Sequence, residues 1–166
     1  MSKKVAKIGV LVALAMVFSY VEVLIPFNFG IPGVKLGVAN IVVVTGFYLL
    51  NPKEVFFISI FRILLMGFLF GNGVSLVYSL SGGLLSFVVM FMLKKFDQFS
   101  VAGVSVAGGV FHNIGQITAA AMVLHSKTII YYLPILVVAG VITGIFIGFL
   151  SCKVINAVNT QNLNMG

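Results

Sequence analysis

The chain has 166 residues, of which 61% are hydrophobic and only 8% charged, with a formal net charge of +7. A soluble domain carries about 25% charged residues, so this composition excludes an ordinary water-soluble domain and predicts a chain that is solvated mainly by lipid. The single cysteine, Cys152, excludes an internal disulfide and a multi-cysteine metal site.

Apolar stretches separated by helix breakers predict six helices in one transmembrane domain. Pro26 and residues 28–33 separate the first two stretches, Asn51 and Pro52 form the next turn, and residues 71–73 the third. The first stretch is interpreted as a retained helix and not as a cleaved signal peptide. The third has a re-entrant segment as its alternative, because Arg62 interrupts it. The helices are expected at about 6–25, 36–50, 53–70, 74–93, 101–124 and 128–155, a compact six-helix bundle (residues 1–155) followed by a polar tail (156–166).

The distribution of lysines predicts the orientation in the cell membrane. With both termini in the cytoplasm, only Lys35 and Lys127 lie outside, and Arg62 lies within a span. This arrangement explains the positive charge without a nucleic-acid partner. The cytoplasmic lysines are then Lys3, Lys4, Lys7, Lys53, Lys94, Lys95 and Lys153.

Several polar residues lie within the predicted spans, where they need partners. A charge near the bilayer centre costs about 2.5–3.5 kcal/mol on insertion scales. Arg62 is expected near the middle of the third helix, and Glu22 about one turn before the extracellular end of the first. His112 and Gln116 are four residues apart and share a helical face, with Asn113 beside them. Together they predict a polar stripe at mid-depth on the fifth helix.

Three further polar residues lie in the outer half of the predicted bundle. They are Lys35 and Asn40 around the start of the second helix, and Asn72 between two glycines. Because so many costly groups share one depth, we favour a solute-binding site. The structural alternatives are an ion pair of Glu22 with Arg62, hydrogen bonds between helices, a lysine reaching the headgroups and an asparagine turn.

Small residues on the first helix predict a surface for another helix. Gly9 and Ala13 are four residues apart, as are Ala15 and Ser19, and this spacing permits close helix approach. The glycines of the last two helices are assigned to packing within the bundle.

Three segments carry a family resemblance. They are residues 32–41 (PGVKLGVANI), 61–65 (FRILL) and 109–116 (GVFHNIGQ). They resemble the Gx transporter family, which is also labelled heptaprenyl diphosphate synthase component I. That family is similar to the substrate-binding S-components of energy-coupling factor (ECF) transporters, and the resemblance extends from the first helix to about residue 155.

The resemblance implies a six-helix S-component-like fold and a role in import. Such a subunit binds a small organic solute from outside, such as a vitamin or an isoprenoid- or quinone-related precursor. It then joins a transmembrane scaffold subunit and two cytoplasmic ATPases, and topples to release the solute. The loop at about 26–34 would cover the site, and Gly9, Ala13 and Ala15 would face the scaffold.

The residues argue against catalysis by this chain. Magnesium and diphosphate require clustered carboxylates, and Asp97 is the only aspartate. The chain lacks a phosphate-binding loop ending in Gly-Lys-Ser/Thr, and His112 and His125 are expected at different depths, so no metal or cofactor is expected. The alternative function is a non-transporting accessory subunit of prenyl-quinone biosynthesis or of flavin-linked extracellular electron transfer.

Overall fold

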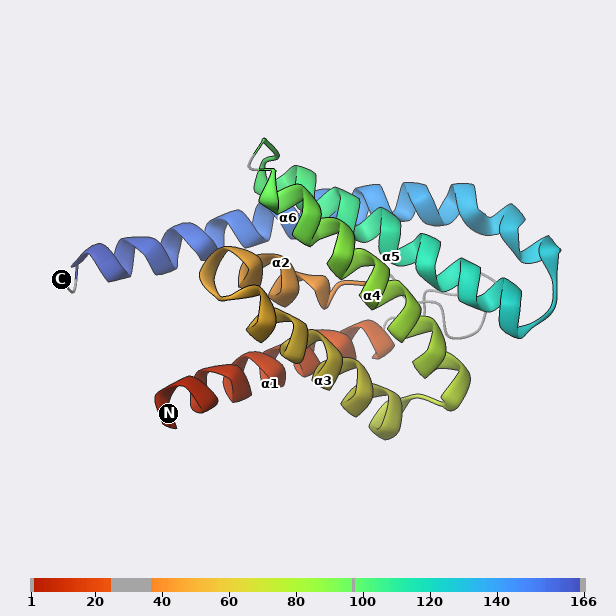
Figure 1. The fold of residues 1–166 in the computed structure, drawn as a ribbon, viewed down its shortest axis with the longest axis horizontal. Helices are drawn as coiled ribbons and strands as arrows, with labels where there is room; N and C mark the ends of the chain where they lie inside the picture. The colour runs from red at the N-terminus through yellow and green to blue at the C-terminus, as the bar shows by residue number, and fades with distance from the viewer. Residues whose placement is uncertain (1, 25–36, 97, 165–166) are drawn as a thin grey trace.

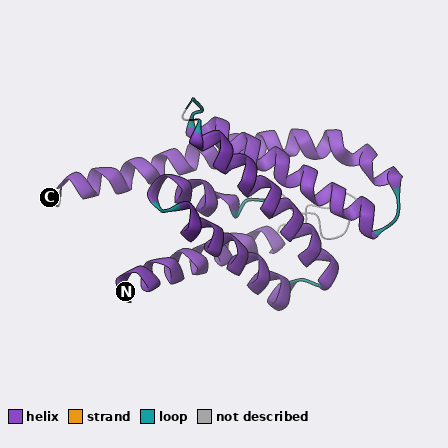
Figure 2. Cartoon of the chain, in the orientation of Figure 1, coloured by secondary structure: helices purple, strands orange, loops and turns teal. Residues whose placement is uncertain are grey.

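The structure is a computed structural model that describes residues 2–24, 37–96 and 98–164. Helices make up nearly all of this part of the chain (Figures 1 and 2). The order is α1 (Ser2–Leu24), α2 (Asn40–Leu49), α3 (Pro52–Phe70), α4 (Gly73–Lys95), α5 (Val101–Val123), the 3-10 helix η1 (Lys127–Tyr132) and α6 (Leu133–Asn164).

The six predicted helices are present, but three have different limits. α1 begins at Ser2 and not at residue 6. α2 begins at Asn40 and not at residue 36, because Gly37 has a φ of +83°, which an α-helix cannot accommodate. The last helix begins at Leu133, after η1, and continues to Asn164 through most of the predicted polar tail. Residues 156–164 contain neither glycine nor proline, so no residue of the tail breaks the helix.

Local sequence signals explain where the middle helices begin. Pro52 occupies the first turn of α3, and the Glu54 carboxylate accepts from the Asn51 N–H at 3.3 Å. The Asn72 side chain caps α4 by accepting from the Ser75 N–H at 2.8 Å. Ser100 caps α5 by accepting from the Gly103 N–H. The turns predicted at Asn51–Pro52 and at 71–73 are therefore confirmed.

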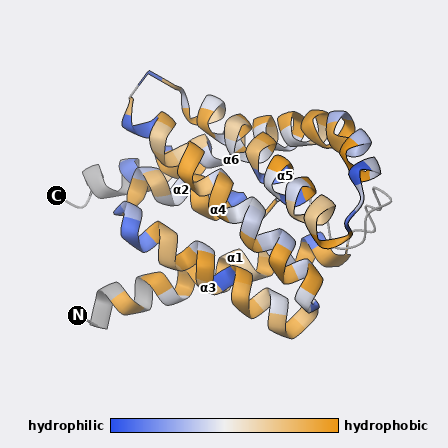
Figure 3. Cartoon of the chain, turned by 45° about the vertical axis from the view of Figure 1, so that its right-hand side comes forward, coloured by the Kyte–Doolittle hydropathy of each residue, from blue (hydrophilic) through white to orange (hydrophobic). Residues whose placement is uncertain are grey.

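The outward faces of the helices are largely apolar (Figure 3). Two helical stretches among the described residues, Gly73–Lys95 and Lys127–Thr160, are long and apolar enough to cross a membrane. α2, with 10 residues, extends about 15 Å, or half of a hydrocarbon core. As described, it is too short to span alone, which corrects the prediction of a second spanning helix at 36–50.

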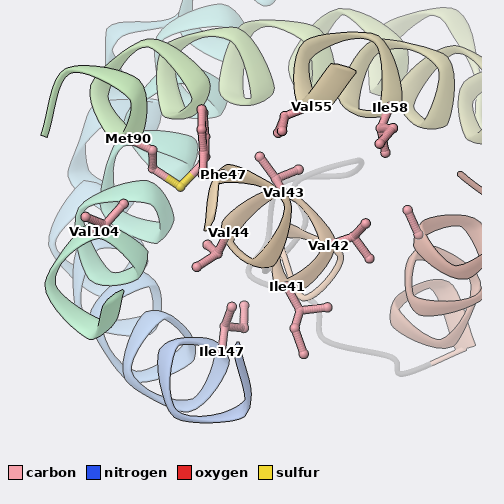
Figure 4. Packing of buried hydrophobic residues seen from close by; sticks show 11 residues of the cluster. Ile41, Val42, Val43, Val44, Phe47, Val55, Ile58, Met90, Val104 and Ile147 are labelled. Atoms are coloured by element: carbon pink, nitrogen blue, oxygen red, sulfur yellow. The ribbon is translucent and has the colours of Figure 1, made fainter. Parts of the chain in front are cut away.

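α2 is the central helix of the bundle. It contacts each of the other five α-helices, and every residue from Asn40 to Phe47 is buried. Val43, Val44 and Phe47 project from it toward side chains of the surrounding helices (Figure 4). The Lys94 ammonium, from the last turn of α4, donates to the Phe47 carbonyl near the end of α2, where a cation also interacts favourably with the helix dipole.

Glycines bring α5 and α6 into close contact. A Cβ at Gly144 of α6 would lie 2.6 Å from the Val106 Cα of α5, and the backbones of Gly109 and Gly140 also touch. The prediction that these glycines serve packing is confirmed. At the opposite side of the bundle, α1 packs mainly on α3, and the start of α1 lies at the same end of the molecule as the end of α6 (Figure 1).

Candidate functional site

Polar side chains from four helices are buried in one region of the bundle. α1 contributes Glu22, α2 contributes Asn40, α3 contributes Arg62, and α5 contributes His112 and Gln116. The sequence predicted all five as site residues, and the helix packing brings them together. We call this group, with Ser19 and Gly37, the polar cluster.

The centre of the polar cluster encloses a small cavity. Its solvent-accessible volume is about 20 Å³, which is enough for about one water molecule. Its walls combine charged, hydroxyl and imidazole groups with apolar side chains. The lining residues are Ser19, Glu22, Gly37, Arg62, Ile63, Met66, Ser79 and His112.

Arg62 is the cation of the cavity wall. Its Nη1 donates to the Ser19 hydroxyl at 3.1 Å, and the charge of Glu22 acts on it electrostatically. The buried Nε has no hydrogen-bond partner in the described structure. An unmet donor in such a site costs about 1–3 kcal/mol, so the guanidinium retains capacity to bind an acceptor.

Gly37 closes the cavity between α1 and α2. Its N–H donates to Glu22 Oε1 at 2.5 Å, and its φ of +83° is a conformation that favours glycine. A Cβ at this position would lie 3.2 Å from both Asn40 Nδ2 and His112 Cδ2. Gly37 therefore holds the start of α2 against Glu22 and His112.

His112 and Gln116 form the α5 side of the polar cluster. Their Nε2 atoms lie 3.0 Å apart, as the spacing of four residues predicted. Gly82 of α4 packs directly on this pair, because a Cβ there would lie 2.7 Å from the His112 carbonyl oxygen and 2.8 Å from Gln116 Cγ. The backbone of α4 therefore packs closely against both residues and restricts their movement.

A model of one protein family matches most of the chain. Its description is heptaprenyl diphosphate synthase component I, and it matches residues 11–154. The chain belongs to this family. The whole polar cluster lies within the matched range, and the family resemblance stated from the sequence is confirmed. No curated protein and no solved structure matches this chain.

Asn113 bonds a neighbouring helix, which is the structural alternative that the sequence left open for it. It is fully buried, and its Nδ2 donates to the Leu136 carbonyl of α6 at 2.6 Å. One residue along a helix turns the side chain by about 100°, so Asn113 faces α6 while His112 lines the cavity. Asn113 therefore makes an interhelical hydrogen bond.

Other predicted residues lie away from the polar cluster. Asn72 is exposed and caps α4, so it does not reach the cavity. Lys35 and the predicted covering loop at 26–34 lie outside the described residues. On α1, Gly9 and Ala13 are exposed, but Ala15 is 0% exposed and packs in the core, so it offers no surface to a partner here.

Sequence reasoning missed five lining residues, namely the apolar Ile63 and Met66 together with Ser19, Ser79 and Gly37. Ser19 lies three residues before Glu22 and therefore shares its helical face, which is a signal that could have found it. Ser79 has no such cue, because a serine in an apolar helix often bonds its own backbone. Gly37 contributes through its N–H and its positive φ, and neither property is visible in its side chain.

The described residues also enclose a larger apolar cavity, of about 480 Å³, between α1, α2 and α6. Leu14, Phe18, Val42 and Val158 are among its lining residues. Thr45 is the one polar side chain in this lining, so the cavity has little with which to orient a polar molecule. Among the described residues, no three His, Cys, Asp or Glu side chains form a group that could hold a metal ion.

Proposed function

We propose that this protein is a membrane-embedded solute-binding subunit of an ECF-type importer for a small organic molecule. The observation that carries this proposal is the polar cluster, which collects a cation, an anion and several amide, hydroxyl and imidazole groups inside a largely apolar bundle. Charged groups inside membrane bundles mark solute or ion sites by default.

The outer surface supports a location in the membrane. Phe68 is 79% exposed, Ile142 63% and Phe146 61%. Burying a side chain of this kind is worth about 1.5–3 kcal/mol, so a surface made of many such residues is unfavourable in water. Lipid removes this cost, because its chains are as apolar as the side chains.

Unmet donors favour binding over a purely structural role. Arg62 Nε and Asn40 Nδ2 are both buried without a hydrogen-bond partner in the described structure. Polar groups that serve only to hold helices together are normally satisfied by one another. Arg62 also lines the cavity, so its open Nε is suited to a bound molecule.

The size of the cavity bears on how a solute enters. About 20 Å³ admits a water-sized group and not a whole vitamin. Binding therefore requires the walls to separate. Gly37 lines the cavity and follows residues 26–34 in the sequence, which the family resemblance assigns to covering the site.

The proposed partners are a transmembrane scaffold and two cytoplasmic ATPases. The exposed small residues Gly9 and Ala13 lie on α1 among apolar side chains such as Val10 and Val17. Small residues on a lipid-facing helix permit close approach of a second helix. We assign this α1 face to the scaffold, and no catalytic role to this chain.

The apolar cavity between α1, α2 and α6 favours a second candidate. Its volume of about 480 Å³ suits an isoprenoid chain. This would fit an accessory subunit of prenyl-quinone biosynthesis or of flavin-linked electron transfer. The polar cluster has no role in that function, so we place it second.

Partner capture from membranes distinguishes the two functions. The tagged chain is purified in mild detergent from its native host, and the bound proteins are identified by mass spectrometry. Import predicts a membrane scaffold with two ATPases, lost when Gly9 and Ala13 are both changed to leucine. Thr118→Leu, at an exposed site on α5, is the matched control and retains them. Recovery of prenyltransferase or redox proteins in their place would contradict the importer.

A further inference from the structure

The Arg62 guanidinium is anchored on one side only. Nη1 donates to Ser19 Oγ at 3.1 Å, while the buried Nε has no partner in the described structure. Arg62 is 7% exposed and lines the cavity. The Nε–H lies on the side edge of the planar guanidinium, and paired N–H groups of such an edge match the two oxygens of a carboxylate.

The walls of the cavity match a small planar group. The space of about 20 Å³ is near the size of a single polar head group. Ser79 and His112 add polar surface, and Met66 adds an unbranched side chain that adapts readily to an inserted group. The rest of a solute would extend past these walls.

Charge limits which anion the cavity can accept. Among the described lining residues, Arg62 is the cation and Glu22 the anion. Buried charge is costly unless it is compensated, so a doubly charged phosphate would leave a large negative excess beside Glu22. A single carboxylate that binds the side edge of the Arg62 guanidinium adds only one negative charge. It also gives the unpaired Nε–H a hydrogen-bond acceptor.

We propose that the solute of this importer carries one carboxylate, which binds the side edge of the Arg62 guanidinium. This inference rests on the proposed function and names its substrate class. Ser19 acts as a positioning residue, because its hydroxyl holds Nη1 and thereby orients the open edge. Glu22 disfavours solutes with two negative charges.

Matched pairs of acids and uncharged analogues test this proposal. Unfolding midpoints of the purified protein are measured with nicotinate and nicotinamide, biotin and biotin amide, pantothenate and pantothenol, and lipoate and lipoamide. Small molecules that copurify are extracted, treated with a methylating reagent and weighed by mass spectrometry, so that each carboxylate adds one methyl group. The protein is then compared with its Arg62→Lys variant.

The expected result is a stabilising or copurifying molecule with one carboxylate. Its uncharged analogue binds at least about tenfold more weakly, as expected for loss of a charge-assisted hydrogen bond. Arg62→Lys keeps the positive charge but removes the paired N–H donors of the guanidinium, so it should weaken binding of the acid by a similar factor. Lys127→Ala, at an exposed site in η1, binds as the unchanged protein does.

Ser19→Ala provides a second variant, in case Arg62→Lys does not fold. It retains the guanidinium but removes its anchor, and we expect several-fold weaker binding of the acid with little change for the uncharged analogue. A bound molecule without a carboxylate would overturn this inference and leave solute binding in place. So would a molecule that both variants bind as tightly as the unchanged protein does. If no molecule is retained and no pair stabilises the protein, the proposed function fails and this inference with it.

Discussion

The backbone of Gly37 connects two parts of the polar cluster. Its N–H binds Glu22 of α1, and its Cα lies against Asn40 of α2 and His112 of α5. Any side chain at this position would meet both neighbours and would also have to adopt a positive φ. The residue is therefore a sensitive point for both stability and binding.

Gly37→Ala is expected to destabilise the protein. A left-handed backbone costs a non-glycine residue about 1–2 kcal/mol, and the contacts at 3.2 Å require Asn40 or His112 to move. We expect the free energy of unfolding in detergent to fall by about that amount. The measurement is reversible unfolding followed by circular dichroism.

Gly9→Ala is the matched control for this substitution. Gly9 lies within α1, and nothing lies within 4 Å of a Cβ there. Alanine in a helix interior is favoured over glycine by about 0.5–1 kcal/mol, so this variant should be unchanged or slightly more stable. Equal losses in the two variants would show that Gly37 has no special backbone role.

At the level of single residues, the most informative signal in the sequence was the free-energy cost of placing a charged side chain in lipid. Glu22 and Arg62 could be assigned to the interior because a charge facing lipid is expensive, and both are buried near one cavity. For Asn113 the sequence left both a site role and an interhelical hydrogen bond open, because it does not show which neighbouring helix a side chain meets. Ser79 could not be predicted, since its place in the wall depends on the packing of α4 on α5.

At the scale of helices, the bundle consists of two groups that differ in how closely their helices pack against one another. α4, α5 and α6 are joined through glycines whose Cα atoms touch the neighbouring backbone, as at Gly115 against Ser81 and Gly82. α1 and α3 pack against each other on the other side of α2. The polar cluster lies where these two groups of helices meet.

Gly144→Ala tests the close contact of α5 with α6. The added Cβ would lie 2.6 Å from the Val106 Cα, and backbone cannot rotate away as a side chain can. Overpacking of this kind costs about 1–3 kcal/mol, and we expect a corresponding loss in the free energy of unfolding. Gly73→Ala, with nothing within 4 Å of its Cβ, should change stability by no more than about 0.5 kcal/mol. If both variants retain full stability, the α5–α6 contact is looser than described.

Helix positions could be predicted well where breakers mark them. Asn51–Pro52 and residues 71–73 delimit α3 closely, and both limits agree with the structure. The start of α2 could not be predicted, because it depends on the φ of Gly37. η1 was missed because residues 129–132 (IIYY) continue the apolar stretch of α6, and hydropathy does not distinguish a 3-10 helix from the first turns of α6.

At the scale of the whole molecule, the chain combines an apolar exterior with one polar interior region. Residues 11–154 match the family model, and the polar cluster lies inside that range. The larger apolar cavity lies apart from it, between α1, α2 and α6. We propose that the polar cluster holds a solute, and that Arg62 and Gln116 are needed to hold it.

Native mass spectrometry of the gently purified protein tests that claim most directly. The unchanged protein should carry a stoichiometric small molecule, visible as one added mass that organic extraction removes and identifies. Arg62→Ala and Gln116→Ala should each lose that mass while remaining folded, and Thr118→Ala, at an exposed site, should keep it. If both cluster variants retain the molecule as the unchanged protein does, or if repeated preparations of the unchanged protein carry none, the account of a solute site at the polar cluster is contradicted.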